Sequence, residues 1–154
     1  MNNVYMHGCS GGEECAISYK EVTVEITFPG GVAVDARFNG FCVRTDQPLA
    51  NGGKNSAPAP FDLFLAALGT CAGLYALRFC QERRIASVGL KLTLESEQDD
   101  THHRLSGVRL IISLPPEFPD KYRRALVRAV NQCSVKRAIL DPPEFDIVVT
   151  SPER

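Results

Sequence analysis

Residues 60–84 read PFDLFLAALGTCAGLYALRFCQERR, and this segment decides the fold. From Leu63 to Leu77 it carries no charge, so aliphatic and aromatic side chains would cover the whole circumference of a helix. A helix that is apolar on every side must be buried. Pro60 suits the first helical position and Asp62 the first turn. The helix would be about 37 Å long, at about 1.5 Å per residue, so we expect a second copy of the chain to help cover it.

A membrane span is the main alternative for this segment. Its uncharged part is shorter than the roughly 20 residues that a span needs, and strand-like segments flank it on both sides. We therefore expect the core helix of a protein that has no membrane partner. Cys71 lies at the centre of the helix, and Cys80 follows nine residues later, near the opposite face. A free cysteine is often only a small buried apolar residue, so neither thiol indicates chemistry by itself.

The composition is typical of one soluble globular domain. The chain has 154 residues, of which 44% are hydrophobic and 23% are charged. Its 17 basic and 18 acidic residues give a formal net charge of −1, which argues against nucleic acid or acidic lipid as a partner. We divide the chain into a flexible N-terminal arm, residues 1–19, and a single domain, residues 20–154.

The N-terminal arm lacks the apolar core of a signal peptide, so we expect a cytoplasmic protein. In that reducing compartment the six cysteines are reactive thiols or metal ligands, not disulfide partners. His7, Cys9 and Cys15 could bind zinc, but their spacing is not a common zinc motif and no second cysteine pair follows at the usual distance. We therefore predict no metal site, and we place His102 and His103 in a solvated loop.

Alternating apolar and polar residues predict strands at 22–28 and 32–38, joined by a turn at Pro29-Gly30-Gly31. Asn39-Gly40 is a strong hairpin signal and leads into a third strand. A two-residue turn there would set three cross-strand pairs: Phe38 with Phe41, Arg37 with Cys42, and Asp35 with Arg44. The polar face of the hairpin is then either a solvated surface or the place from which one arginine reaches a thiolate on another element.

The rest of the domain is predicted from the same signals. Residues 45–60 are rich in turn formers and form a loop that enters the central helix. We then expect a strand at 88–94, a polar hairpin tip at 95–104, a strand at 105–114 with a bulge at Gly107, helices at 117–132 and 134–140, and a closing strand with Phe145, Ile147 and Val149. The spacing of apolar residues in the helix at 117–132 directs Cys133 toward the core.

Two cysteine contexts, considered together, resemble the OsmC/Ohr family of thiol-dependent peroxidases. The first consists of Thr45-Asp46-Gln47-Pro48, Gly52-Gly53, the helix entry Ala57-Pro58-Ala59-Pro60-Phe61-Asp62-Leu63, and Gly69-Thr70-Cys71-Ala72. The second is Cys133-Ser134-Val135-Lys136-Arg137, with serine where the family commonly has proline. The separation of the two motifs and the order of strands and helices are also similar, and the resemblance covers roughly residues 20–151.

The resemblance implies an α+β fold in which two chains intertwine as a homodimer. The long central helices would be buried in the middle, with antiparallel sheets of both subunits wrapped around them. Each pair of Cys71 and Cys133 would lie at the dimer interface. This architecture agrees with the expectation that the central helix needs more cover than one small sheet offers.

The resemblance also implies a reaction. Cys71 would attack an organic hydroperoxide as a thiolate and become a sulfenic acid, which Cys133 would resolve as a disulfide. Asp62 would orient an arginine that favours the thiolate, with Arg37 in that role and Arg44 as its competitor. The implied reductant is a dithiol or a lipoyl protein, and neither a metal nor a bound organic cofactor is implied.

A second function class uses the same thiols without catalysis. In a redox-responsive binding or sensor dimer, Cys71 and Cys133 would switch between dithiol and disulfide with little turnover. A purely structural dimer would keep them inert, with slow alkylation of Cys71 at neutral pH. The roles of the other four cysteines, Cys9, Cys15, Cys42 and Cys80, stay open.

Overall fold

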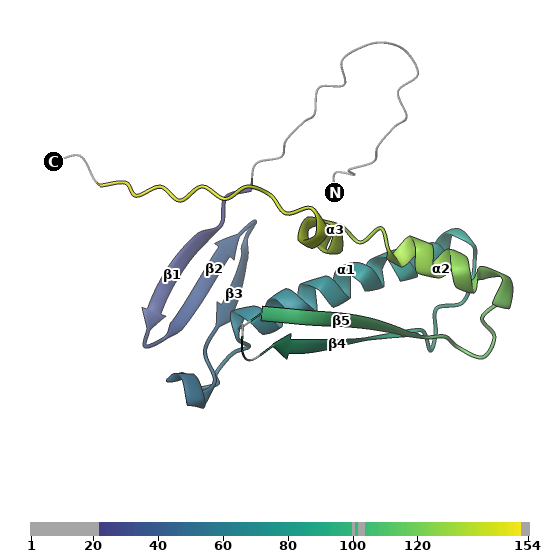
Figure 1. Cartoon of the computed structure of the whole chain (residues 1–154), viewed down its shortest axis with the longest axis horizontal. Coiled ribbons are helices and arrows are strands. Elements are labelled where there is room, and N and C mark those ends of the chain that lie inside the picture. Colours follow the sequence, from purple (N-terminus) through teal and green to yellow (C-terminus); the bar gives the residue numbers. More distant parts are fainter. Residues whose placement is uncertain (1–21, 100, 102–103, 152–154) are drawn as a thin grey trace, which may run out of the picture.

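The computed structural model describes residues 22–99, 101 and 104–151 (Figure 1). Its elements, in chain order, are β1 (Glu25–Gly30), β2 (Ala33–Phe38), β3 (Phe41–Thr45), the short 3-10 helix η1 (Leu49–Asn51), α1 (Pro60–Glu82), β4 (Lys91–Asp99), β5 (Arg104–Ser113), the 3-10 helix η2 (Asp120–Tyr122), α2 (Arg123–Val130) and α3 (Ser134–Leu140). The fold is α+β, as predicted. The whole predicted N-terminal arm, residues 1–19 with His7, Cys9 and Cys15, and both adjacent histidines lie outside the described residues.

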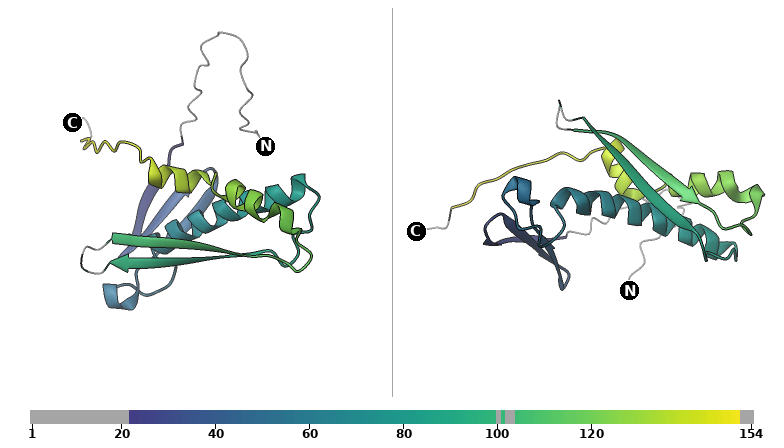
Figure 2. Two further views of the ribbon diagram at one scale, coloured as in Figure 1. Left: turned by 45° about the vertical axis from the view of Figure 1, so that its right-hand side comes forward. Right: turned by 90° about the horizontal axis from the view of Figure 1, so that it is seen from below.

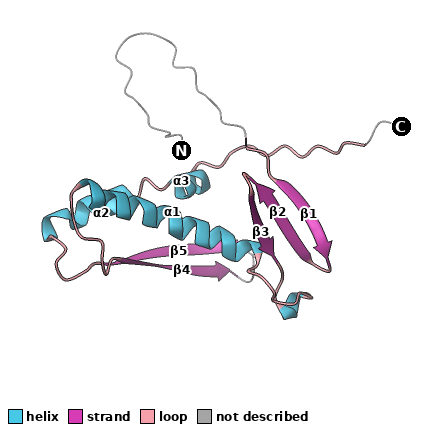
Figure 3. Cartoon of the chain, turned by 180° about the vertical axis from the view of Figure 1, so that it is seen from behind, coloured by secondary structure: helices cyan, strands magenta, loops and turns pink. Residues whose placement is uncertain are grey.

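The long helix α1 is the axis around which the other elements are arranged. The β4–β5 hairpin runs along it, α2 and α3 pack on it, and the three-stranded sheet lies beside its N-terminal end (Figure 1). Figure 2 shows the hairpin crossing α1 obliquely, and Figure 3 shows from behind that the two sheets are separate. The central helix predicted from residues 60–84 is therefore confirmed.

The first sheet has the strand order β1-β2-β3, and both of its pairings are antiparallel. All three predicted pairs across the Asn39-Gly40 turn are present, including Arg37 opposite Cys42. Asn39 and Gly40 have φ angles of 49° and 80°, the left-handed geometry that a tight two-residue turn requires. The first turn, at Gly31 and Val32, begins two residues later than predicted, because Pro29 and Gly30 still belong to β1.

Helix α1 begins at Pro60 and ends at Glu82. The proline nitrogen carries no hydrogen, so it leaves no unpaired N–H group at the helix start. Five of its residues are buried in the core: Leu68, Ala72, Ala76, Phe79 and Cys80. Other apolar side chains of the same helix are exposed in the single chain, namely Phe61, Phe64, Leu74 and Leu77. By length and composition α1 could cross a membrane, a test that the core helix of a soluble protein also passes.

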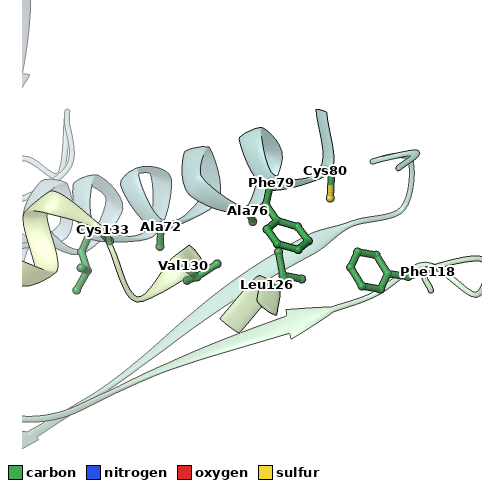
Figure 4. Packing of buried hydrophobic residues seen from close by; sticks show 9 residues of the cluster. Ala72, Ala76, Phe79, Cys80, Phe118, Leu126, Val130 and Cys133 are labelled. Atoms are coloured by element: carbon green, nitrogen blue, oxygen red, sulfur yellow. Dashed lines mark hydrogen bonds between the residues drawn. The ribbon is translucent and has the colours of Figure 1, made fainter. Parts of the chain in front are cut away.

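The core is the contact between α1 and α2. Figure 4 shows Phe79, Leu126, Val130 and Phe118 gathered between the two helices and the chain that precedes α2. The ring of Tyr122 meets Phe79 edge to face, with the ring centroids 6.1 Å apart. Leu126 is almost fully buried, so it holds α2 against α1 at this point. This packing fixes the position of the chain that continues to Cys133.

Several predicted boundaries were wrong. Val88 is exposed and lies in a turn at Gly89, whose φ is +82°, so β4 starts only at Lys91. The polar segment 95–104 is mostly paired strand, because β4 and β5 continue to the pair of Asp99 and Arg104. The bulge does lie next to Gly107: the register shifts between Glu97 and Gln98, opposite it.

The predicted helix at 117–132 is shorter than expected. Pro119 precedes a single 3-10 turn, and the α-helix begins only at Arg123. Proline disfavours the helical backbone conformation of the residue before it, so Phe118 stays outside the helix and the helix cannot begin before Pro119. The short helix at 134–140 is confirmed with the bounds that we predicted.

The predicted closing strand is not formed within the single chain. Residues 142–150 have no regular secondary structure and extend away from α3 (Figures 1 and 2). A strand needs a neighbour to accept and donate its backbone hydrogen bonds, and none of the described strands pairs with this segment. Phe145, Ile147 and Val149 are 86%, 91% and 90% exposed.

Candidate active site

Two thiols from distant parts of the chain meet where α3 begins beside α1. Cys71 is half-buried at the middle of α1, and Cys133 is fully buried directly before the first residue of α3. The Cys133 thiol interacts with the Cys71 sulfur and also faces the backbone oxygen of Leu68, at 3.9 Å. The buried residues of α2 fix the position of Cys133, because only Asn131 and Gln132 separate it from Val130, the last residue of α2. The structure therefore brings the two predicted cysteines together.

The surroundings of Cys71 favour its thiolate. Burial by itself would raise the pKa of this thiol. The backbone amide of Val135, the thiol of Cys133 and the backbone amide of Ser134 all donate hydrogen bonds to the sulfur, and together they lower its pKa below the ordinary thiol value. These amides belong to the first turn of α3, whose N–H groups have no partner inside the helix.

The pKa of Cys133 is shifted in the opposite direction, upward. Burial raises its pKa first, and the negative charge that develops on Cys71 raises it further. The amides of Lys136 and Val135 oppose these effects but do not cancel them. The pair is thus divided into one thiol that ionises readily and one that stays protonated. A thiol and a thiolate in contact are what nucleophilic attack followed by disulfide formation requires.

Arg37, Arg44 and Asp62 lie elsewhere in the single chain. Both arginines are exposed on the polar face of the first sheet, and neither contributes to the pKa of Cys71. The Asp62 carboxylate accepts a hydrogen bond of 3.1 Å from the backbone N–H of Ala59 at the start of α1. It precedes Cys71 by nine residues, or about 13 Å along the helix axis. The roles of these three residues stay predictions.

The loop before α1 is organised by a buried carboxylate that the sequence reasoning did not single out. Asp46 accepts hydrogen bonds from the backbone N–H groups of Gln47, Lys54 and Ser56 and from the Ser56 hydroxyl, at 2.7 to 3.0 Å. The amide and hydroxyl of Ser56, followed by the other donors, hold the pKa of this carboxyl far below its usual range. Gly53 packs against Gln47 so closely that a Cβ would lie 1.8 Å from its carbonyl oxygen.

The Asp46 cage fixes the path of the chain into α1, because the backbone N–H of Asp46 also bonds to the Pro58 carbonyl at 3.3 Å. The sequence offers one signal for this cage: Asp46 is followed by Pro48 and by Gly52-Gly53, and an aspartate at the start of such a loop typically bonds to the backbone of the loop. The cage acts on loop geometry and does not touch the thiols.

The remaining described cysteines differ from the pair. Cys80 is fully buried in the core, and burial raises the pKa of its thiol. Cys42 is exposed on the first sheet. Among residues 22–99, 101 and 104–151, no three histidine, cysteine, aspartate or glutamate side chains are grouped as a metal site would need. A cavity of about 690 Å³ between β5, α2 and α3 has Leu68 in its wall, but neither Cys71 nor Cys133 lines it.

A long central helix with a half-buried, readily ionised thiol against a second, protonated thiol defines an α+β protein with a paired-cysteine site. The sequence model of the OsmC-like protein family matches residues 53–148, which include both cysteines. The chain therefore belongs to the OsmC-like family, within the OsmC/Ohr group that the two motifs resemble. No curated protein matches the sequence.

Solved structures share the fold at low sequence identity. The chain is similar to a Psychrobacter arcticus protein whose name refers to osmotic stress and a detoxification response (TM-score 0.68, 22% identity, 79% of this chain and 90% of the other). It is also similar to an OsmC-like protein from Mycoplasma pneumoniae (0.65, 13%, 80% and 89%). A third relative is an organic hydroperoxide resistance protein, OsmC, from Legionella pneumophila (0.55, 19%, 79% and 90%). At these identities the likeness shows the fold alone.

Proposed function

We propose that this protein is a thiol-dependent peroxidase that reduces organic hydroperoxides with Cys71 and Cys133. The observation that carries the proposal is the contact of the two thiols at the start of α3, where the backbone amides of Ser134 and Val135 favour a thiolate on Cys71. Membership of the OsmC-like family supports it, and so does the name of the Legionella pneumophila relative. A peroxide-related redox role fits both.

The proposed reaction starts at the Cys71 thiolate. Its sulfur attacks the terminal oxygen of the hydroperoxide, the O–O bond breaks, and the departing alkoxide takes up a proton to become an alcohol. Cys71 is then a sulfenic acid. The Cys133 sulfur attacks the Cys71 sulfur, the S–O bond breaks, and the hydroxyl leaves as water when it takes the thiol proton. An external dithiol, free or on a lipoyl protein, reduces the resulting disulfide and becomes a disulfide itself.

We further propose that the working form is a homodimer. The single chain leaves two sets of apolar side chains uncovered: the alternating residues Val24, Ile26 and Phe28 near and along β1, and Phe145, Ile147 and Val149 in the C-terminal segment. Exposed apolar surface of this extent indicates an interface. The exposed apolar residues of α1 require the same kind of cover.

The dimer would also complete the environment of Cys71. Arg37 projects from the polar face of the first sheet, and in an intertwined dimer it could reach a Cys71 thiolate, with Asp62 orienting the guanidinium. Arg44, two residues along the neighbouring strand from Cys42, is the competitor for this role. Apolar walls beside the thiols would favour a fatty or aromatic alkyl hydroperoxide over hydrogen peroxide.

Turnover of cumene hydroperoxide with dihydrolipoamide as reductant tests the function, with hydrogen peroxide measured beside it. We expect rapid consumption by the wild type, none by Cys71→Ser, and a single oxidation event without an intramolecular disulfide in Cys133→Ser. Cys42→Ser, an exposed cysteine outside the pair, is the matched control and should keep full activity. A fully reduced wild type that forms the disulfide once but does not turn over would instead identify a redox-responsive binding dimer.

A further inference from the structure

One hydrogen bond ties the start of α3 to the middle of α1. The Tyr75 hydroxyl and the Ser134 hydroxyl lie 3.0 Å apart, although the two residues are far apart in the sequence. In the part of the chain that the structure describes, it is the one hydrogen bond between a side chain of α1 and a side chain of α3. The bond therefore has no side-chain substitute at this contact.

Both ends of this bond are next to the thiol pair. Tyr75 is one helical turn after Cys71, so the two side chains lie on the same face of α1. Ser134 follows Cys133 directly, and its own backbone amide is a donor to the Cys71 sulfur. The hydroxyl contact thus spans the same two elements as the thiol contact, one turn further along α1.

Apart from this bond, α3 is held by its first amides at the Cys71 sulfur and by the Lys136 ammonium, which donates to the Asn131 side chain at 2.6 Å. It is a single short helix without a buried residue, and Val135 is the member of it that packs against the core. Its first residue is serine, which leaves the backbone free, whereas a proline at a first helical position would fix φ by its ring. The bond from Tyr75 adds a side-chain restraint to the first residue of the helix.

We propose that Tyr75 is a positioning residue of the thiol pair: through Ser134 it holds the first turn of α3, and with it Cys133, against Cys71. The hydroxyl of Tyr75 does not touch the reacting atoms and acts through the position of α3. The inference rests on the proposed function for its catalytic meaning, but the geometry it claims can be measured without any peroxide. The groups that act on the Cys71 sulfur are Cys133 and the amides of Ser134 and Val135, so a displaced α3 would change all of them together.

The test compares Tyr75→Phe, Ser134→Ala and the double variant with the wild type. Alkylation of Cys71 by iodoacetamide is followed across pH by peptide mass. We expect the pH midpoint of alkylation to rise in both single variants, since the donors to the thiolate are no longer held. After one equivalent of cumene hydroperoxide, the disulfide between Cys71 and Cys133 should form about 3- to 10-fold more slowly, the range that one net hydrogen bond corresponds to.

Two controls separate positioning from general stability. Tyr122→Phe removes a hydroxyl from a ring packed in the same core and should leave the pH midpoint unchanged. Ser134→Thr keeps a hydroxyl at the first position of α3 and should restore most of the wild-type behaviour. The double variant should be no worse than either single variant, because both remove the same bond.

The outcomes distinguish this inference from the proposed function. A lower melting temperature in Tyr75→Phe, with an unchanged pH midpoint and an unchanged rate of disulfide formation, would overturn the positioning role. A shifted midpoint in a protein that shows no turnover with any hydroperoxide would support the positioning role while refuting the peroxidase. Additive effects of the two single variants would also contradict the inference, since they would show that Tyr75 and Ser134 act separately.

Discussion

The first prediction concerns the C-terminal segment, residues 142–150, and its contribution to the association of two chains. Phe145, Ile147 and Val149 alternate along one face of the segment and are 86%, 91% and 90% exposed in the single chain, so nearly all of their apolar surface is available to a partner. The perturbation is the triple change Phe145→Ser, Ile147→Ser and Val149→Ser. The matched control is Glu144→Ser with Asp146→Ser, which alters the opposite face of the same segment and removes no apolar surface.

The expected magnitude follows from burial. Fully burying a valine, isoleucine or phenylalanine side chain contributes about 1.5–3 kcal/mol, so three of them give about 4.5–9 kcal/mol for each chain. We take about half of this, because the added strand buries one face and loses backbone entropy when it is ordered. Two chains then contribute about 4.5–9 kcal/mol, which corresponds to a dissociation constant weaker by about three to six orders of magnitude.

Sedimentation equilibrium over a concentration series measures this difference. We expect a dimer for the wild type and for the control, and a monomer at the same concentrations for the triple variant. Circular dichroism should show that the helices of the triple variant are intact, since the segment has no regular structure in the single chain. A triple variant that dimerises as tightly as the wild type would refute the reasoning, and so would a wild type that stays monomeric.

Four further predictions concern single side chains. Asp46→Asn should lower the free energy of unfolding at neutral pH. Because the folded-state pKa of Asp46 is depressed, the ionised carboxylate stabilises the wild type above the unfolded pKa of about 3.9, and this stabilisation is lost as the pH falls further. Urea unfolding across pH should show this dependence only in the wild type. Gly53→Ala should disrupt the same loop, seen as a large drop in melting temperature, because its Cβ would overlap the Gln47 carbonyl. Leu126→Ala should cost about 2–5 kcal/mol in urea unfolding, since this side chain is almost fully buried. Cys80 should react with iodoacetamide only when the protein unfolds, because it is buried and its pKa is raised, whereas early labelling at neutral pH would contradict its placement.

The sequence predicted those parts of the fold that depend on local signals. The register of β2 and β3 follows from Asn39-Gly40, whose backbone preference allows one tight turn, and all three predicted pairs are present. The bounds of α3 were also predictable, because Asp141-Pro142-Pro143 stops a helix. The error at 117–132 came from giving the apolar spacing more weight than Pro119, although proline decides where a helix can start.

The sequence could not predict features that depend on how separate segments meet in space. The alternation at 145–149 is typical of an amphipathic strand, but a strand forms only where a neighbouring strand pairs with it, and none of the described strands does. The contact of Tyr75 with Ser134 also escaped prediction, because it depends on how α3 docks on α1 and has no local signature. The two cysteines were found only because two motifs were considered together.

The position of Cys133 directly before α3 places a thiol and the first amides of a helix together beside Cys71. The chain that leaves α2 must place the Cys133 sulfur in contact with Cys71, and the residues that follow it are the first amides of α3. Those amides favour a thiolate on Cys71, while burial keeps Cys133 protonated. In the proposed reaction, the start of α3 would therefore supply the amides that favour the attacking thiolate, and the residue directly before it would supply the resolving thiol. An arginine would then strengthen a preference that the single chain already has, and both steps of the proposed reaction would depend on the position of α3.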